Sequence, residues 1–140
     1  MYHSFTKLYI HLILVGNDRM ALIIPEKEKA IYNNIKTQIE KTESTVLEMN
    51  GTQDHIHILI NMSPKISLSE LSKQIKGASS HWINQNRVLS HRFSWQKGIR
   101  GFSIGYSRLN ATKKYIRNQK EHHKKNSFAE ELDYIINLYK

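Results

Sequence analysis

The sequence predicts an α+β protein of the ferredoxin-like type, in which two helices cover one face of an antiparallel sheet in a split βαβ arrangement. The first observation is the periodicity of the apolar residues, which follows the order strand, helix, strand, strand, helix, strand between residues 7 and 106. The second is the length of 140 residues without a cysteine, an internal repeat or an evident linker. We therefore expect one domain, 1–140, with a core that needs no disulfide.

The first half of the chain supplies a strand, a helix and a hairpin. Residues 7–15 predict a buried strand, because apolar side chains point to both of its faces. A helix over 25–43 begins with a proline, which suits a first helical turn, and continues with isoleucines at helical spacing. The segment 45–61 contains two runs of β-forming residues separated by Asn50 and Gly51. This dipeptide tolerates positive φ and predicts the turn of the hairpin.

The second half adds a long helix, a short strand and two further helices. A capping box that starts at Ser67 predicts a helix that ends near residue 86. Residues 102–106 predict a short fourth strand, and 110–126 a third helix rich in cations. A second capping box at Ser127 begins a final helix, which needs a docking site for its apolar face. That face comprises Phe128, Leu132, Ile135, Ile136 and Tyr139.

Positive charge is concentrated in one stretch of the chain. The whole chain has a net charge of +9, and the segment 87–125 contains eleven lysines and arginines against the single acid Glu121. Aromatic residues interleave with these cations, a pattern typical of surfaces that bind single-stranded nucleic acid. A solvated basic face is the alternative.

The longest apolar run, 12–15, is too short for a membrane span, and the first residues do not resemble a secretory signal, so we expect no membrane and a cytoplasmic location.

Two histidines lie side by side on the predicted strand 55–61. Side chains alternate along a strand, so the three isoleucines of this segment face the helices and His55 and His57 share the face without helices. Two neighbouring imidazoles can converge on one cation. A polar sheet surface is the alternative interpretation of such a pair.

The cationic helix predicted over 110–126 carries a second chemical pattern. Tyr115, Gln119 and His122 follow one another at i, i+4 and i+7, so a phenol, an amide and an imidazole share one helical face. A nucleophile and a potential metal ligand would therefore lie together. The alternative is that Tyr115 packs against the sheet and Gln119 is solvated.

The segment Asp54-His55-Ile56-His57, followed about sixty residues later by Tyr115-Ile116-Arg117-Asn118-Gln119, resembles the single-tyrosine HUH transposases of small bacterial insertion sequences. The loop 93–98 and the residues Glu121-His122-His123 extend the resemblance over nearly the whole chain. Relatives associated with repetitive extragenic palindromes are similar in the core, and Gln119 favours the insertion-sequence branch.

The resemblance implies a metal-dependent DNA transposase that cleaves and rejoins single-stranded DNA, at element ends that carry hairpins. It implies that Tyr115 is the nucleophile and forms a 5′-phosphotyrosine. It also implies that His55, His57 and Gln119 bind a divalent cation, Mg²⁺ or Mn²⁺. Members of the family act as homodimers with active sites shared between protomers, and we expect the same of this chain.

The basic and aromatic residues near the tyrosine are expected to contact DNA. Cations would bind phosphates and exposed rings would stack on bases. The candidates are Lys113, Lys114, Arg117, Lys120, Trp95 and Phe93. Asp54 could orient one of the two histidines, or it is an ordinary residue of a turn. His122 or His123 could replace Gln119 or contact DNA, or they are helix-end histidines that the dipole favours. None of these residues, nor His11, is assigned as a metal ligand.

Two other functions fit the same residues. One is a binding module of this fold that holds hairpin DNA or RNA without catalysis. The other is a metal-dependent nuclease that uses water as its nucleophile, in which Tyr115 has a structural role.

Overall fold

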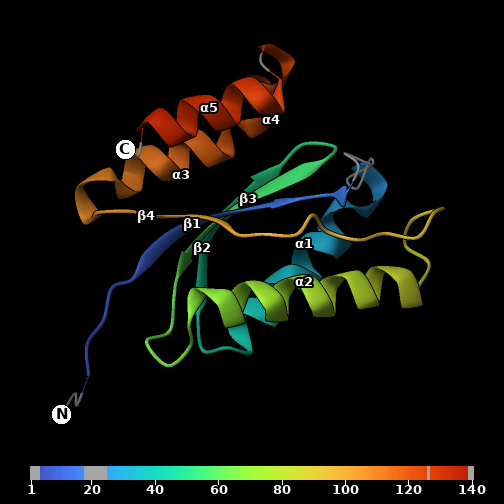
Figure 1. Cartoon of the computed structure of the whole chain (residues 1–140), viewed down its shortest axis with the longest axis horizontal. Helices are drawn as coiled ribbons and strands as arrows, with labels where there is room; N and C mark the ends of the chain where they lie inside the picture. The colour runs from blue at the N-terminus through green and yellow to red at the C-terminus, as the bar shows by residue number, and fades with distance from the viewer. Residues whose placement is uncertain (1–3, 18–24, 126, 139–140) are drawn as a thin grey trace.

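The computed structural model describes residues 4–17, 25–125 and 127–138, and in it a four-stranded antiparallel sheet lies between two layers of helices (Figure 1). The strands are β1 (Tyr9–Val15), β2 (Thr45–Gly51), β3 (His55–Asn61) and β4 (Arg100–Ser103), and they lie in the order β2-β3-β1-β4. This is the order of the split βαβ fold, so the predicted α+β class and topology are confirmed.

Helices α1 (Pro25–Glu40) and α2 (Leu68–Gln85) cover one face of the sheet and enclose the main hydrophobic core. The predicted cap of α2 is present, since the Ser67 hydroxyl accepts a hydrogen bond from the backbone N–H of Glu70 at 3.1 Å. The isoleucines of β3 face these helices, as alternation predicts. The core includes Leu12, Leu14, Ile31, Ile35, Ile39, Ile56, Ile58, Ile60, Leu71 and Ile75.

Three further helices, α3 (Leu109–Arg117), α4 (Gln119–Lys125) and α5 (Phe128–Leu138), cover the opposite face (Figure 1). The prediction that this face stays open is wrong. The face carries apolar side chains that need to be buried, and they form two clusters with these helices. The first cluster consists of Tyr9, Leu59, Ile104 and Ile116, and the second of Ile13, Val15, Phe128 and Ile135.

The apolar face predicted for the final helix is partly correct. Phe128 and Ile135 are buried and Leu132 packs against them, so the helix docks with this stripe on β1. Ile136 is exposed, because it lies one residue beyond the stripe. Tyr139 lies outside the described residues.

None of the helices in the described parts of the chain combines the length and the hydropathy that a membrane span requires.

The hairpin is confirmed, but its turn is not at Asn50 and Gly51. Both residues belong to β2, and the turn consists of the three residues 52–54. Gly51 pairs with Ile56 on β3, and a Cβ atom on it would clash with the carbonyl oxygen of His55. The glycine is needed here for a close approach of two backbones and not for a turn.

Two boundaries in the second half differ from prediction. The fourth strand is Arg100–Ser103 and not 102–106, and a 3₁₀ turn at Tyr106–Arg108 leads into α3. The helix predicted over 110–126 is divided at Asn118. Its carbonyl accepts hydrogen bonds from Glu121 and His122 at 3.1 and 3.0 Å, so it begins α4 where α3 ends. Asparagine favours such positions because its short polar side chain competes with the backbone of a helix.

Candidate functional site

His55 and His57 lie next to each other on β3, on the face that α3, α4 and α5 cover. Both are fully buried, and their ring centroids are 5.1 Å apart. Their placement on one face of the strand is as predicted, although they face a layer of helices and not solvent. A buried imidazole needs partners for both ring nitrogens.

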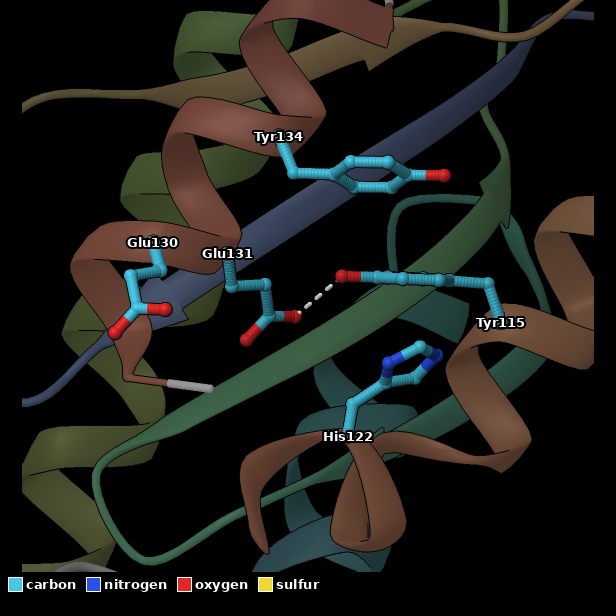
Figure 2. Close-up of a pocket in the computed structure, with 5 residues that line it drawn as sticks. All are labelled: Tyr115, His122, Glu130, Glu131 and Tyr134. Atoms are coloured by element: carbon cyan, nitrogen blue, oxygen red, sulfur yellow. Dashed lines mark hydrogen bonds between the residues drawn. The ribbon is translucent and has the colours of Figure 1, made fainter. Parts of the chain in front are cut away.

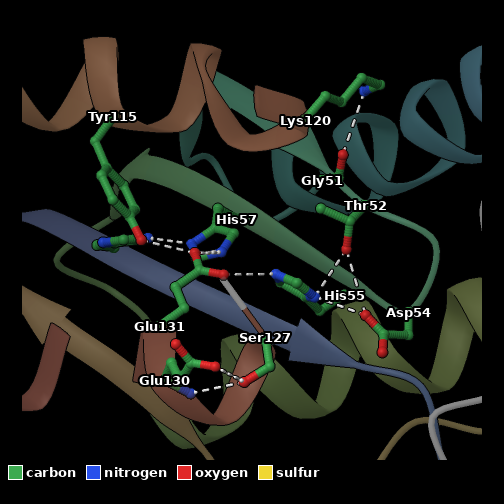
Figure 3. Close-up of polar contacts among 11 residues, drawn as sticks. Gly51, Thr52, Asp54, His55, His57, Tyr115, Lys120, Ser127, Glu130 and Glu131 are labelled. Carbon is green, nitrogen blue, oxygen red and sulfur yellow. Dashed lines mark hydrogen bonds and ion pairs between the residues drawn. The ribbon is translucent and has the colours of Figure 1, made fainter. Parts of the chain in front are cut away.

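A carboxylate on α5 contacts both histidines (Figure 3). Oε2 of Glu131 lies 3.2 Å from Nε2 of His55, and Oε1 lies 2.9 Å from Nε2 of His57. Glu131 is only 5% exposed. The three possible ligand atoms lie within 4.8 Å of one another, and two imidazoles with a carboxylate form a donor set that suits a divalent metal ion.

Sequence reasoning missed Glu131, although a signal for it was present. The residue lies three positions after Phe128 and four before Ile135, within the apolar stripe by which α5 docks. An acidic side chain at such a position is buried once the helix packs, and a buried charge needs a partner. The stripe therefore indicated an interior carboxylate, but not which strand would meet it.

Tyr115, on α3, reaches the same carboxylate. Its hydroxyl donates a hydrogen bond to Oε1 of Glu131 at 2.7 Å (Figure 2). Its ring centroid lies 5.9 Å from that of His57, so the phenol lies beside the histidine pair of its own chain. The ring lies between Tyr134 and His122, and these residues border a hollow of about 310 Å³ together with the two glutamates of α5.

Electrostatics fix the protonation of the two groups in this hydrogen bond. Burial, and then the bond to Glu131, raise the pKa of Tyr115 well above its ordinary value. Burial would also raise the pKa of Glu131, but the hydrogen bonds from His55 and His57 outweigh it and hold that pKa far below its usual range. The pair is therefore a neutral phenol that donates to an ionised carboxylate.

Each histidine also has a partner on its other nitrogen. Nδ1 of His55 lies 2.8 Å from Oδ1 of Asp54, and the Thr52 hydroxyl lies 2.9 Å from the same nitrogen (Figure 3). Nδ1 of His57 lies 2.8 Å from Nε2 of His11 on β1. Partners of this kind orient imidazoles that bind metals. The sequence left this role open for Asp54 and indicated none for His11.

Gln119, the third ligand implied by the resemblance, is the first residue of α4. It is fully buried, and neither its amide nitrogen nor its amide oxygen makes a hydrogen bond of standard geometry within the described part of the chain. Because the helix is divided at Asn118, Gln119 and Tyr115 belong to different helices. The three residues therefore do not share one continuous helix as predicted, although the Gln119 side chain still acts on the Tyr115 hydroxyl by lowering its pKa, and Tyr115 and His122 remain neighbours with ring centroids 4.8 Å apart.

Two of the four cations expected to bind phosphate make contacts within the protein. Nε of Arg117 lies 3.0 Å from Oε1 of Glu48, and Nζ of Lys120 lies 2.7 Å from Oε1 of Glu28. Lys120 also donates to the Asn50 side chain at 2.6 Å. These contacts fasten α3 and α4 to β2 and α1. The other two cations, Lys113 and Lys114, lie on α3, where Lys114 is exposed.

The prediction that Phe93 and Trp95 stack on bases is wrong. Phe93 is 1% exposed and Trp95 7% exposed, and both belong to the main core. The indole N–H of Trp95 donates to the Ser79 hydroxyl of α2 at 2.9 Å. Their rings pack edge to face against each other, so no ring face is available to a base. Phe93 and Trp95 instead fix the loop between α2 and β4 to the core.

Comparisons with known proteins point to one family. Residues 4–119 match the family model "Transposase IS200 like". Two curated proteins, each a transposase for insertion sequence element IS200, come from Salmonella typhimurium and Salmonella typhi; each is 28% identical over 78 residues, which cover 56% of this chain and 51% of the relative. The chain thus spans about half the length of the curated relatives that it matches.

Two solved structures share the fold. A putative transposase from Deinococcus radiodurans R1 superposes with a TM-score of 0.64 and 18% identity, over 85% of this chain and 95% of that one. A REP-associated tyrosine transposase bound to a REP hairpin superposes with a TM-score of 0.65 and 13% identity, over 88% of this chain and 73% of that one. At this level of identity, the likeness concerns the fold.

Proposed function

This chain belongs to the IS200-like transposase family, and on that premise we propose that it cleaves and rejoins single-stranded DNA through Tyr115. One observation carries the proposal. The Tyr115 hydroxyl lies 2.7 Å from a carboxylate that contacts both members of the histidine pair, so a phenol and three possible metal ligands meet at one point of the fold. A nucleophile beside a metal site is the arrangement that phosphoryl transfer by a side chain requires.

The cofactor in this proposal is a divalent cation, Mg²⁺ or Mn²⁺, held by His55, His57 and Glu131. Imidazole and carboxylate donors together suit Mn²⁺ well and Mg²⁺ less well. Gln119 offers a further oxygen ligand, because its buried amide lacks a well-formed hydrogen bond among the described residues. When bound, such a cation neutralises charge on the phosphate and makes the phosphorus more electrophilic.

The reaction proposed for Tyr115 exchanges one ester for another. The phenol oxygen forms a bond to phosphorus as the bond to the 3′ oxygen breaks, which leaves a 5′-phosphotyrosine and a free 3′-OH. The phenol loses its proton and the 3′ oxygen gains one, so no proton is consumed overall. Because the phosphodiester energy stays in the tyrosine ester, rejoining is the reverse step and needs no ATP.

The proposed substrate is single-stranded DNA that carries a hairpin. In support, one structure of the same fold holds a REP hairpin, and the segment 87–125 of this chain contains all of the excess positive charge. Lys113 and Lys114 are proposed as phosphate contacts. Arg117 and Lys120 would first have to release Glu48 and Glu28.

The association of two chains stays a prediction from the resemblance, but for the active site we propose an arrangement other than the shared one that the resemblance implies. In the structure, Tyr115 lies beside the histidine pair of its own chain, so one chain brings together all the groups named here. We propose that catalysis uses this arrangement within one chain, whether or not two chains associate.

The experiment incubates the chain with a labelled single-stranded hairpin oligonucleotide and Mn²⁺, followed by a denaturing gel. We expect a covalent protein–DNA adduct that is absent in Tyr115→Phe and present in Tyr106→Phe, a matched change at a ring that is 79% exposed. Cleavage without an adduct would support the water-dependent nuclease. Binding without cleavage would support the binding module.

A further inference from the structure

His11 is a third buried histidine beside the pair. It lies on β1, opposite Leu59 of β3 and Phe102 of β4. Its Nε2 atom is 2.8 Å from Nδ1 of His57, and the two ring centroids are 5.1 Å apart. His11 is fully buried, as is His57, so no water competes for this hydrogen bond.

A hydrogen bond between two imidazoles links the positions of their hydrogens, because one nitrogen must donate and the other must accept. Here Nε2 of His57 lies 2.9 Å from Oε1 of Glu131, and although this contact lacks the alignment of a standard hydrogen bond, the carboxylate favours a hydrogen on that nitrogen. A neutral His57 then accepts at Nδ1, and the donor is Nε2 of His11. With a cation at Nε2 of His57, the hydrogen of His57 would lie on Nδ1 and the hydrogen of His11 would move from Nε2 to its own Nδ1, so the direction of this bond would be reversed.

Only a neutral imidazole can act both as a hydrogen-bond donor and as an acceptor. Each ring carries one hydrogen before and after the reversal. His55 differs, because the Asp54 carboxylate at its Nδ1 only accepts, and Nδ1 of His55 keeps its hydrogen in either case.

We propose that His11 is a positioning residue of the metal centre. It sets the ring orientation of His57 and accepts the Nδ1 hydrogen of His57 when a cation occupies Nε2. The inference rests on the proposed metal at His55 and His57, and it adds a residue from β1 that is not one of the proposed ligands. Loss of such a partner lowers metal affinity by about 10- to 100-fold.

The experiment measures Mn²⁺ binding by calorimetry for the whole chain and three variants. His11→Phe keeps a ring but removes both nitrogens, and we expect its affinity to fall by about 10- to 100-fold. His11→Gln places an amide where Nε2 was and should recover most of that loss. Phe102→Leu changes the residue that pairs with His11 on β4 but keeps both His11 and His57, and it should bind as wild type does.

Equal affinity in wild type and His11→Phe would overturn the inference, and so would an equal loss in Phe102→Leu. If His11→Phe does not fold, NMR of ¹⁵N-labelled wild type provides the test. We expect the hydrogen of His57 on Nε2 without Mg²⁺ and on Nδ1 with Mg²⁺, and an unchanged position would contradict the proposal.

The two proposals fail in different ways. A wild-type chain that binds Mn²⁺ and forms the DNA adduct, with no dependence on His11, would overturn the role of His11 alone. A wild-type chain that binds no Mn²⁺ and forms no adduct would overturn the proposed function, and the role of His11 with it.

Discussion

At the scale of single residues, Glu131 connects the parts of the centre. Its two oxygens contact His55, His57 and Tyr115, which come from a strand and a helix far apart in the sequence. Alternation along a strand was enough to predict that the histidines share a face. It could not predict their carboxylate partner, because which helix covers a sheet face depends on contacts between distant parts of the chain.

Glu131→Gln should weaken Mn²⁺ binding at least tenfold, because it removes a charged ligand from the cluster. The metal-free chain should also lose about 3 kcal/mol in its free energy of unfolding, since two buried imidazoles lose their anionic partner. Glu130→Gln is the matched control, because Glu130 is exposed and pairs with Ser127. Calorimetry and urea unfolding measure both effects, and equal effects in the two variants would contradict the assignment.

The raised pKa of Tyr115 predicts how stability depends on alkaline pH. Above about pH 10 the unfolded chain loses this phenolic proton while the folded chain keeps it, so the phenol lowers the free energy of unfolding as pH rises. In Tyr115→Phe, that free energy should therefore fall less steeply, by up to about 1.4 kcal/mol per pH unit. Urea unfolding at several alkaline pH values measures the difference, and parallel curves for wild type and variant would contradict it.

At the scale of elements, the hairpin and the divided helix show where local signals suffice. The capping box at Ser67 predicted the start of α2 correctly, because a cap is a local interaction. The dipeptide Asn50–Gly51 predicted the wrong turn, because the glycine serves the contact between β2 and β3. The division at Asn118 is also a local preference, but the helical periodicity of the surrounding residues concealed it.

Gly51→Ala should destabilise the fold by about 2 kcal/mol or more, because the new methyl group would clash with the His55 backbone. Gly77→Ala, in the middle of α2, meets nothing within 4 Å and should stabilise the chain by about 0.5–1 kcal/mol. Thermal unfolding of both variants measures the contrast. Equal shifts of the unfolding temperature in the same direction would show that the close approach at Gly51 does not contribute to stability.

At the scale of the whole molecule, the second helical layer decides how the centre is built. Residue patterns predicted the sheet order and one helical layer, because those follow from periodicity and short connections. They left the other face open, since the docking of α5 depends on apolar residues that match it on β1. The same layer places Tyr115 at the histidine pair of its own chain.

A mixture of Tyr115→Phe and His57→Ala chains should therefore form no DNA adduct. If each site is built within one chain, every site in the mixture lacks either the phenol, in Tyr115→Phe, or one imidazole, in His57→Ala. Sites shared between protomers would restore one complete centre in each heterodimer. The adduct assay on the mixture, beside wild type at equal concentration, distinguishes the two arrangements.

Glu131 also lies beyond residues 4–119, the region that the family model matches. Two genes that agree throughout that region can encode proteins with different residues in contact with the two histidines. Classifying such genes by the shared region alone would group proteins that have Glu131 with proteins that lack it. Sorting them by chemistry therefore requires reading the sequence past the boundary of the match.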